Sequence, residues 1–87
     1  MTEFEILKAS YTATIQFDLA TNVGYLESKR GNEVLHEFCK QIVENSNYCD
    51  NDKRTMKQEL ELLKETLNKE IEAYYQHCWC NIPENIL

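Results

Sequence analysis

Apolar residues recur at a helical spacing through the C-terminal half of the chain. Steps of three and four residues separate them, which places their side chains in one stripe along an α-helix. The stripe begins near Met56 and continues through Leu60, Leu63, Leu67, Ile71, Tyr74 and Cys78. Asp50 or Asp52 can cap the first turn by accepting backbone N–H bonds. The pattern predicts a long amphipathic helix over residues 53–78.

A shorter apolar pattern in the middle of the chain predicts a second helix over residues 33–45. One face of it holds the apolar residues Val34, Leu35, Phe38, Ile42 and Val43. Asn32 is a suitable N-cap, and Gly31 suits the end of whatever precedes it. Short polar stretches at residues 28–32 and 45–52 are the expected breaks between the elements.

The first 28 residues fit two patterns. Alternation with period two predicts a half-buried strand, through Ala9, Tyr11, Ala13, Ile15, Phe17 and Leu19. A helical stripe fits equally well, through Phe4, Leu7, Tyr11, Ile15, Leu19, Val23 and Leu26. Thr2 and Glu5 have the spacing of a capping box, and no Asn-Gly or Asp-Gly turn follows. We therefore expect an all-α, three-helix arrangement, with an N-terminal β-hairpin followed by two helices as the α+β alternative.

Composition describes a folding chain of one domain. Its 87 residues are 43% apolar and 28% charged, with a net charge of −6. No apolar run has the length that a membrane span needs, and the start of the chain lacks the features of a signal peptide. Only two glycines are present, which excludes a glycine-rich nucleotide loop. We expect a soluble, cytoplasmic protein.

Four cysteines and two histidines raise the question of a metal site. A tetrahedral zinc site is conceivable if the second and third helices pack together, with His36, Cys39, Cys78 and Cys80 as ligands. The chain lacks the CxxC spacing of common zinc sites, and cysteine is frequent in ordinary cores. We therefore expect reduced, structural cysteines, and neither a metal nor a cofactor.

The candidates for catalysis have simpler structural roles. His77 and Cys78 are adjacent, and adjacent side chains on a helix point in different directions. Asp50 and Asp52 beside Lys53 resemble a nuclease site by residue type alone, but carboxylates at a helix start also cap it and offset its dipole. We expect a protein that is not an enzyme.

The length of the third helix points to a binding function. A helix of about 25 residues measures roughly 38 Å, which exceeds the width of a compact domain of this size. Neighbouring helices, a second subunit or a different protein must cover it. The side chains expected to contact a partner are acidic or aromatic, namely Glu61, Glu65, Glu72, Tyr75 and Trp79.

These features predict a small acidic protein-binding module, an adaptor or an inhibitor that occludes a larger partner. A partner with a basic groove would fit, as in phage or mobile-element inhibitors of nucleic-acid-binding enzymes. One alternative is a structural helical homo-oligomer. Another is a small nucleic-acid-associated regulator, in which Lys29 and Arg30 could form one small basic patch with Lys53 and Arg54 if the two breaks lie together.

Overall fold

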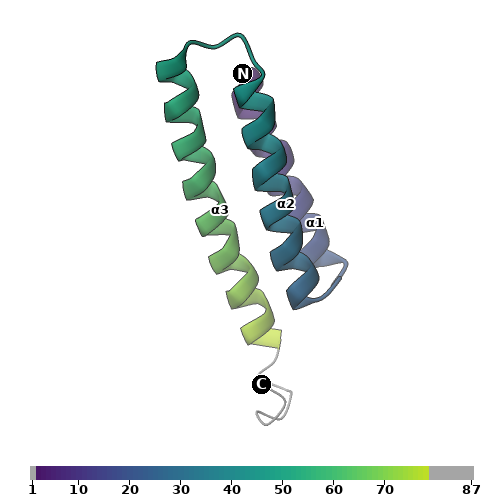
Figure 1. The fold of residues 1–87 in the computed structure, drawn as a ribbon. Helices are drawn as coiled ribbons and strands as arrows, with labels where there is room; N and C mark the ends of the chain where they lie inside the picture. The colour runs from purple at the N-terminus through teal and green to yellow at the C-terminus, as the bar shows by residue number, and fades with distance from the viewer. Residues whose placement is uncertain (1, 79–87) are drawn as a thin grey trace.

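The chain folds into three antiparallel helices joined by two short loops (Figure 1). The computed structural model describes residues 2–78, in which α1 spans Glu3–Ala20, α2 spans Tyr25–Glu44 and α3 spans Asp50–Cys78. These residues contain no strand. The all-α, three-helix prediction is confirmed, and the N-terminal segment is a helix rather than a hairpin.

The start of α1 is closed by the predicted capping box. The backbone N–H of Glu5 donates to Thr2 Oγ1, and the backbone N–H of Thr2 donates to Glu5 Oε1, each at 3.1 Å. Two threonines inside the helix donate hydrogen bonds to its backbone. Thr12 Oγ1 (2.9 Å) and Thr14 Oγ1 (2.8 Å) each donate to the backbone carbonyl four residues earlier. These bonds satisfy the threonine hydroxyl groups within the helix, so the alternating pattern around them is compatible with a helix.

The break predicted at residues 28–32 is wrong, because α2 already begins at Tyr25 and runs through this stretch. The turn lies earlier, where Asn22 and Gly24 have φ angles of 56° and 120°. Asn and Gly are the residues that most readily adopt such left-handed conformations. Gly31 is therefore an interior position of α2, and Asn32 is buried instead of capping a helix start.

The second predicted break agrees with the structure. The loop at residues 45–49 separates α2 from α3, and α3 begins at Asp50. Asp50 and Asp52 both lie in the first turn of α3. Negative charge in that turn offsets the positive end of the helix dipole.

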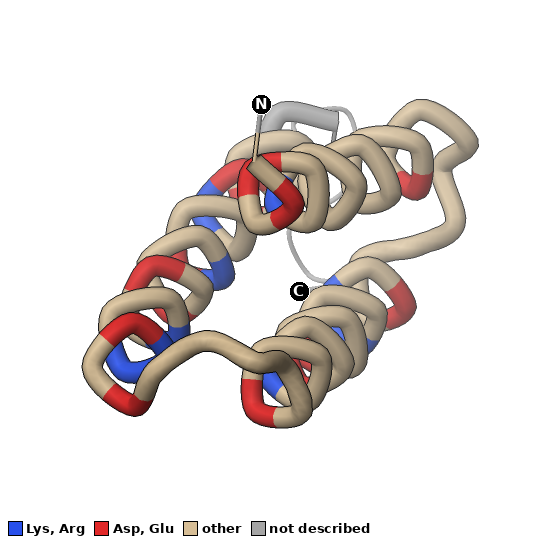
Figure 2. The backbone as a smooth tube through the Cα atoms, turned by 90° about the horizontal axis from the view of Figure 1, so that it is seen from above, with Lys and Arg blue, Asp and Glu red and all other residues tan. Residues whose placement is uncertain are grey.

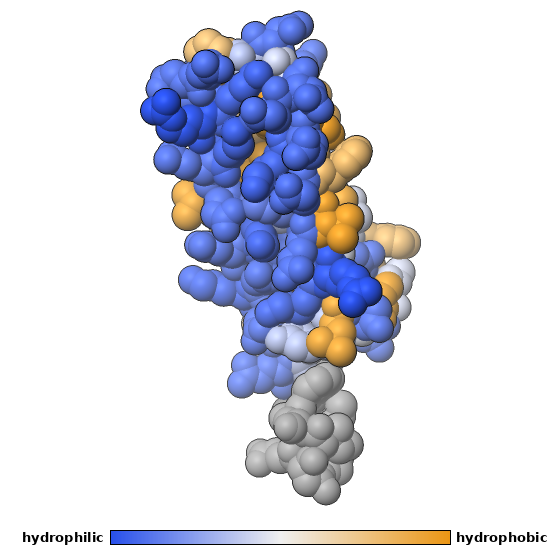
Figure 3. Space-filling view, in the orientation of Figure 1, coloured by the Kyte–Doolittle hydropathy of each residue, from blue (hydrophilic) through white to orange (hydrophobic). Residues whose placement is uncertain are grey.

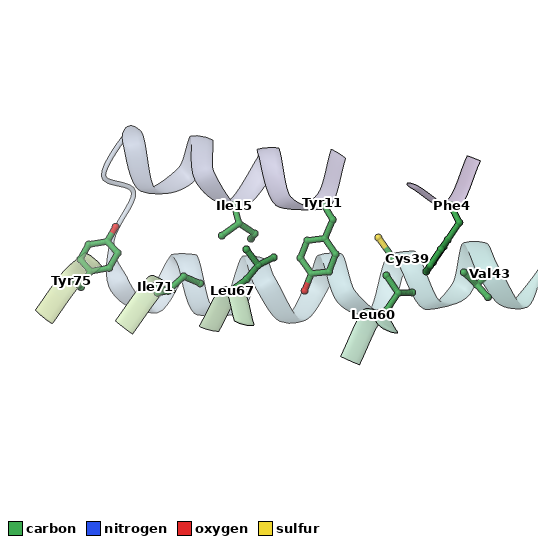
Figure 4. Close-up of a cluster of buried hydrophobic side chains, with 9 residues drawn as sticks. All are labelled: Phe4, Tyr11, Ile15, Cys39, Val43, Leu60, Leu67, Ile71 and Tyr75. Carbon is green, nitrogen blue, oxygen red and sulfur yellow. The ribbon is translucent and has the colours of Figure 1, made fainter. Parts of the chain in front are cut away.

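The core runs along the axis where the three helices meet (Figure 4). The predicted stripe of α3 supplies much of it, since Leu60, Leu67 and Ile71 are fully buried. Tyr75 is buried as well, whereas the neighbouring Tyr74 is only partly buried. The remaining buried apolar residues come from α1 and α2: Phe4, Tyr11, Ile15, Cys39 and Val43. The long third helix is thus covered by the other two helices of its own chain.

Candidate protein-binding face

The second helix places polar residues inside the bundle and apolar residues outside. Its inward line contains Ser28, Asn32 and His36, all buried. On its outward side, Val34 and Phe38 are each 60% exposed and Ile42 is 41% exposed. The apolar face predicted for residues 33–45 is therefore not a core face as a whole. Val43 lies in the core and Leu35 packs against it. Val34, Phe38 and Ile42 face solvent.

A buried hydrogen-bond network explains why the polar line of α2 lies inside. The Tyr11 hydroxyl of α1 donates to Asn32, both to its backbone carbonyl (3.1 Å) and to its side-chain oxygen. The Asn32 amide nitrogen donates to the Lys64 carbonyl (3.0 Å) and to Asn68 Oδ1 (2.8 Å), both on α3. Burial raises the pKa of Tyr11, which keeps its hydroxyl protonated as a donor. The network joins all three helices at one level of the bundle.

His36 lies one turn further along the same inward line and is also buried. Its Nε2 is 3.0 Å from Glu61 Oε2, within ion-pair distance but without the alignment of a hydrogen bond. Burial lowers the pKa of His36, and the Glu61 carboxylate opposes this shift in part. The imidazole is therefore held mainly in its neutral form. A ring enclosed in this way serves the packing of the helices and is not open to a substrate.

The first helix also has an apolar outward side. Ile6 and Phe17 are 50% and 65% exposed, and the small residues Ser10 and Ala13 are exposed between them. Their spacing of four, three and four residues puts them on one line of α1. No charged residue occurs between Lys8 and Asp18, and Figure 2 shows most of α1 without charge between its two ends. A helix without a charged side is typical of one that is covered on more than one side.

The exposed apolar line of α1 and that of α2 together form what we term the outer face. It lies on the side of α1 and α2 away from α3. Hydrophobic surface gathers along this edge of the molecule in Figure 3, at the right, whereas the surface over α3 is mostly hydrophilic. The sequence signal that could have located it is the uncharged line along α1. The residues of the outer face are Ile6, Ser10, Ala13, Phe17, Val34, Phe38 and Ile42.

A pocket of about 240 Å³ opens at one end of the outer face. Its walls are mostly apolar, with Ile6 and Leu7 of α1, Ile42 of α2 and Tyr48 of the following loop, and the carboxylate-bearing Glu3 of α1 also lines it. The pocket shows that the apolar lines of the two helices adjoin there. It can take a single apolar side chain from a docked protein.

The side chains that the sequence suggested for partner binding are not gathered on one open surface. Tyr75 lies in the core, where its hydroxyl accepts a hydrogen bond from the backbone N–H of Gly24 (2.9 Å). Glu72 accepts from Lys29 (2.8 Å) and from the Tyr25 hydroxyl (2.5 Å), and Glu61 lies against His36 as described above.

Two further side chains were expected to contact a partner. Glu65 is exposed on α3, and Trp79 lies outside the described residues. Two of the three glutamates thus have partners within the chain, and the acidic face of α3 stays a prediction.

The basic residues form no single patch, because one pair lies near the start of α2 and the other near the start of α3, at opposite ends of the bundle. Lys29 pairs with Glu72 towards the end of α3. Lys53 donates to the Glu44 carbonyl at the end of α2 (2.8 Å). A wide pocket near this second joint has both signs of charge in its walls, with Lys57 beside Glu44. The condition for one basic patch is not fulfilled, since the stretch at residues 28–32 lies inside α2 and the two basic pairs do not meet.

The conceivable zinc ligands are only partly described. His36 and Cys39 lie in the core, and burial raises the pKa of the Cys39 thiol. The side chains of Cys78 and Cys80 lie outside the described part of the chain. Within that part, no three histidine, cysteine or acidic side chains form a metal-binding cluster.

No family model matches the sequence, and neither the curated proteins nor the solved structures contain a significant match. Among the residues that the structure describes, no helix combines the length and apolar character needed to cross a membrane.

Proposed function

We propose that this chain is a small, non-enzymatic protein-binding module that docks through the outer face. One observation carries the proposal: α2 buries Ser28, Asn32 and His36 and exposes Val34, Phe38 and Ile42. Exposing large apolar side chains to water is unfavourable, and a contiguous patch of them typically marks an interaction site. A docked protein would remove this apolar surface from water.

The positions of the reactive side chains support a role without catalysis. The His36 ring is enclosed between α2 and α3, and the Cys39 thiol is buried, with a raised pKa that disfavours the nucleophilic thiolate. Nucleophilic catalysis needs an accessible nucleophile next to a base. Their burial instead fits side chains that stabilise the fold.

The acidic composition supports docking of a neutral surface on the outer face. The net charge of −6 keeps the chain soluble while its apolar side chains are exposed. An adaptor and an occluding inhibitor would both use this face, and they differ only in which site of the partner becomes covered.

A photo-crosslinking experiment tests the proposal. A benzophenone amino acid replaces Phe38 on the outer face or, as the matched control, Leu62 on α3, since the two positions are 60% and 62% exposed. We expect irradiation in the producing cells to give a defined protein adduct from position 38 and none from position 62. The proposal is rejected if position 38 gives no adduct in a folded chain, or if both positions give the same adducts.

A further inference from the structure

The outer face is apolar and has a pocket at one end, and these features bear on which partner covers it. Resting on the proposed function, we infer that the occupant is a second copy of this chain, packed face to face about a two-fold axis. In this arrangement Phe17 of each copy enters the pocket beside Ile6 and Ile42 of the other copy.

The charge distribution permits an identical partner at the outer face. Two copies with a net charge of −6 each repel one another, so they can approach closely only through surfaces that lack charge. The seven residues of the outer face are uncharged, and Glu3 is the one charged residue among the described residues that line the adjoining pocket. A different protein recognised by charge would need complementary charged groups on this face. A second copy, which presents the same uncharged face, needs no complementary charged groups.

The pocket and Phe17 are suitably placed for a two-fold axis. Both lie on the same side of α1, and the 11 residues from Ile6 to Phe17 correspond to about 16 Å along the helix. An axis that lies in the plane of the interface, perpendicular to α1 and midway between them, sets each Phe17 over the pocket of the other copy. Ser10 and Ala13 lie near that midpoint, and their small side chains allow the two α1 helices to approach closely.

The apolar area agrees with what a stable dimer requires. The exposed parts of Ile6, Phe17, Val34, Phe38 and Ile42 amount to roughly 500 Å² per copy. A standard protein interface buries about 800 Å² per partner, a little over half of it apolar. The outer face therefore supplies the apolar share of one such interface.

Sedimentation velocity and native mass spectrometry of the purified chain test the inference. We expect a particle of twice the chain mass of 10.3 kDa. Phe17→Glu, which places a carboxylate in the largely apolar pocket beside Glu3 of the other copy, should give a folded monomer. The matched control Leu62→Glu, on α3, should remain a dimer. A chain that is monomeric from about 1 µM to 1 mM overturns the inference.

Disulfide trapping tests the predicted axis. Ala13→Cys, in a background in which Cys49, Cys78 and Cys80 are replaced by serine, should form a disulfide between two copies on mild oxidation. Residues near a two-fold axis meet their own counterparts within reach of such a bond. A dimer that is not trapped and that Phe17→Glu leaves intact would use another face, and the inference would be wrong.

The results also separate this inference from the proposed function. A monomer whose position 38 still crosslinks to a different protein refutes the second copy and leaves the binding module in place. A monomer that gives no adduct from position 38 refutes both.

Discussion

Asn32 joins all three helices through one buried side chain. Its oxygen accepts from Tyr11 of α1, and its amide nitrogen donates to Asn68 Oδ1 and the Lys64 carbonyl of α3. Buried polar groups are costly when they lose their partners. A network of this kind therefore contributes to stability and restricts how the helices slide along one another.

Replacing this side chain should destabilise the fold. Asn32→Ala removes the side-chain acceptor of the Tyr11 hydroxyl, which keeps the backbone carbonyl of residue 32, and it leaves Asn68 Oδ1 without its donor. We expect a loss of about 1–3 kcal/mol in the free energy of unfolding. Urea unfolding followed by circular dichroism measures it. Asn47→Ala, at an exposed loop position, should cost less than about 0.5 kcal/mol. Equal effects of the two substitutions would contradict this role of Asn32.

His36 should make stability depend on pH. Burial lowers its pKa in the folded state below the ordinary value of 6.5, with Glu61 and Glu37 opposing the shift and Lys64 and Lys40 adding to it. As the pH falls below about 6.5, the unfolded chain binds the proton first, so stability is lost. At higher pH both states are neutral, and the loss disappears.

Urea unfolding at about pH 7.5 and about pH 5.5 compares the wild type with His36→Gln. We expect the variant to lose less stability on acidification than the wild type. An unchanged loss would show that other groups, such as paired carboxylates, account for the whole dependence.

At the scale of the helices, the two glycines have opposite roles. Gly24 precedes α2 with a φ of 120°, and an added Cβ would lie 2.5 Å from Glu27 Oε2. Gly31 lies inside α2, where an added Cβ would meet only Asp18 Oδ2 at 3.4 Å, an ordinary contact. The first position requires glycine for its backbone, and the second does not.

The two glycine-to-alanine substitutions should therefore differ in sign. Gly31→Ala should stabilise the chain by about 0.5–1 kcal/mol, because alanine favours the interior of a helix. Gly24→Ala should destabilise it, because the left-handed backbone disfavours a side chain. Thermal unfolding of both variants checks the prediction. Two shifts of the same direction would contradict the placement of the turn.

These glycines also show how far the sequence predicts the elements. The long stripe of α3 and the capping box at Thr2 and Glu5 are local patterns, and both predictions are confirmed. The break before α2 was misplaced because Gly24 and Gly31 are indistinguishable by residue type. Only the course of α1 beside α2 separates them.

The outer face was harder to predict than the fold. Val34, Phe38 and Ile42 form an apolar stripe that local reasoning assigns to the core. The structure turns this stripe outwards because Asn32, on the other side of α2, finds partners in Tyr11 and Asn68, both distant in sequence. A single sequence shows both stripes of α2 but not the partners that decide between them.

At the scale of the whole molecule, the bundle has two unlike sides. The surface over α3 is mostly hydrophilic, and the outer face of α1 and α2 is apolar (Figure 3). A chain of this size buries only a modest share of its surface, so covering the outer face would add to its stability. The arrangement fits a small module that works in contact with another polypeptide.

Paired double substitutions test the orientation of α2 in the bundle. One double variant combines Val34→Glu and Phe38→Glu on the outward stripe, and the other combines Ser28→Glu and Asn32→Glu on the inward stripe. Circular dichroism compares the helix content of the two variants. The outward pair should keep the helix content of the wild type, since its glutamates remain in water. The inward pair should unfold the chain, because buried unpaired carboxylates are very costly. A folded inward pair and an unfolded outward pair would contradict the account.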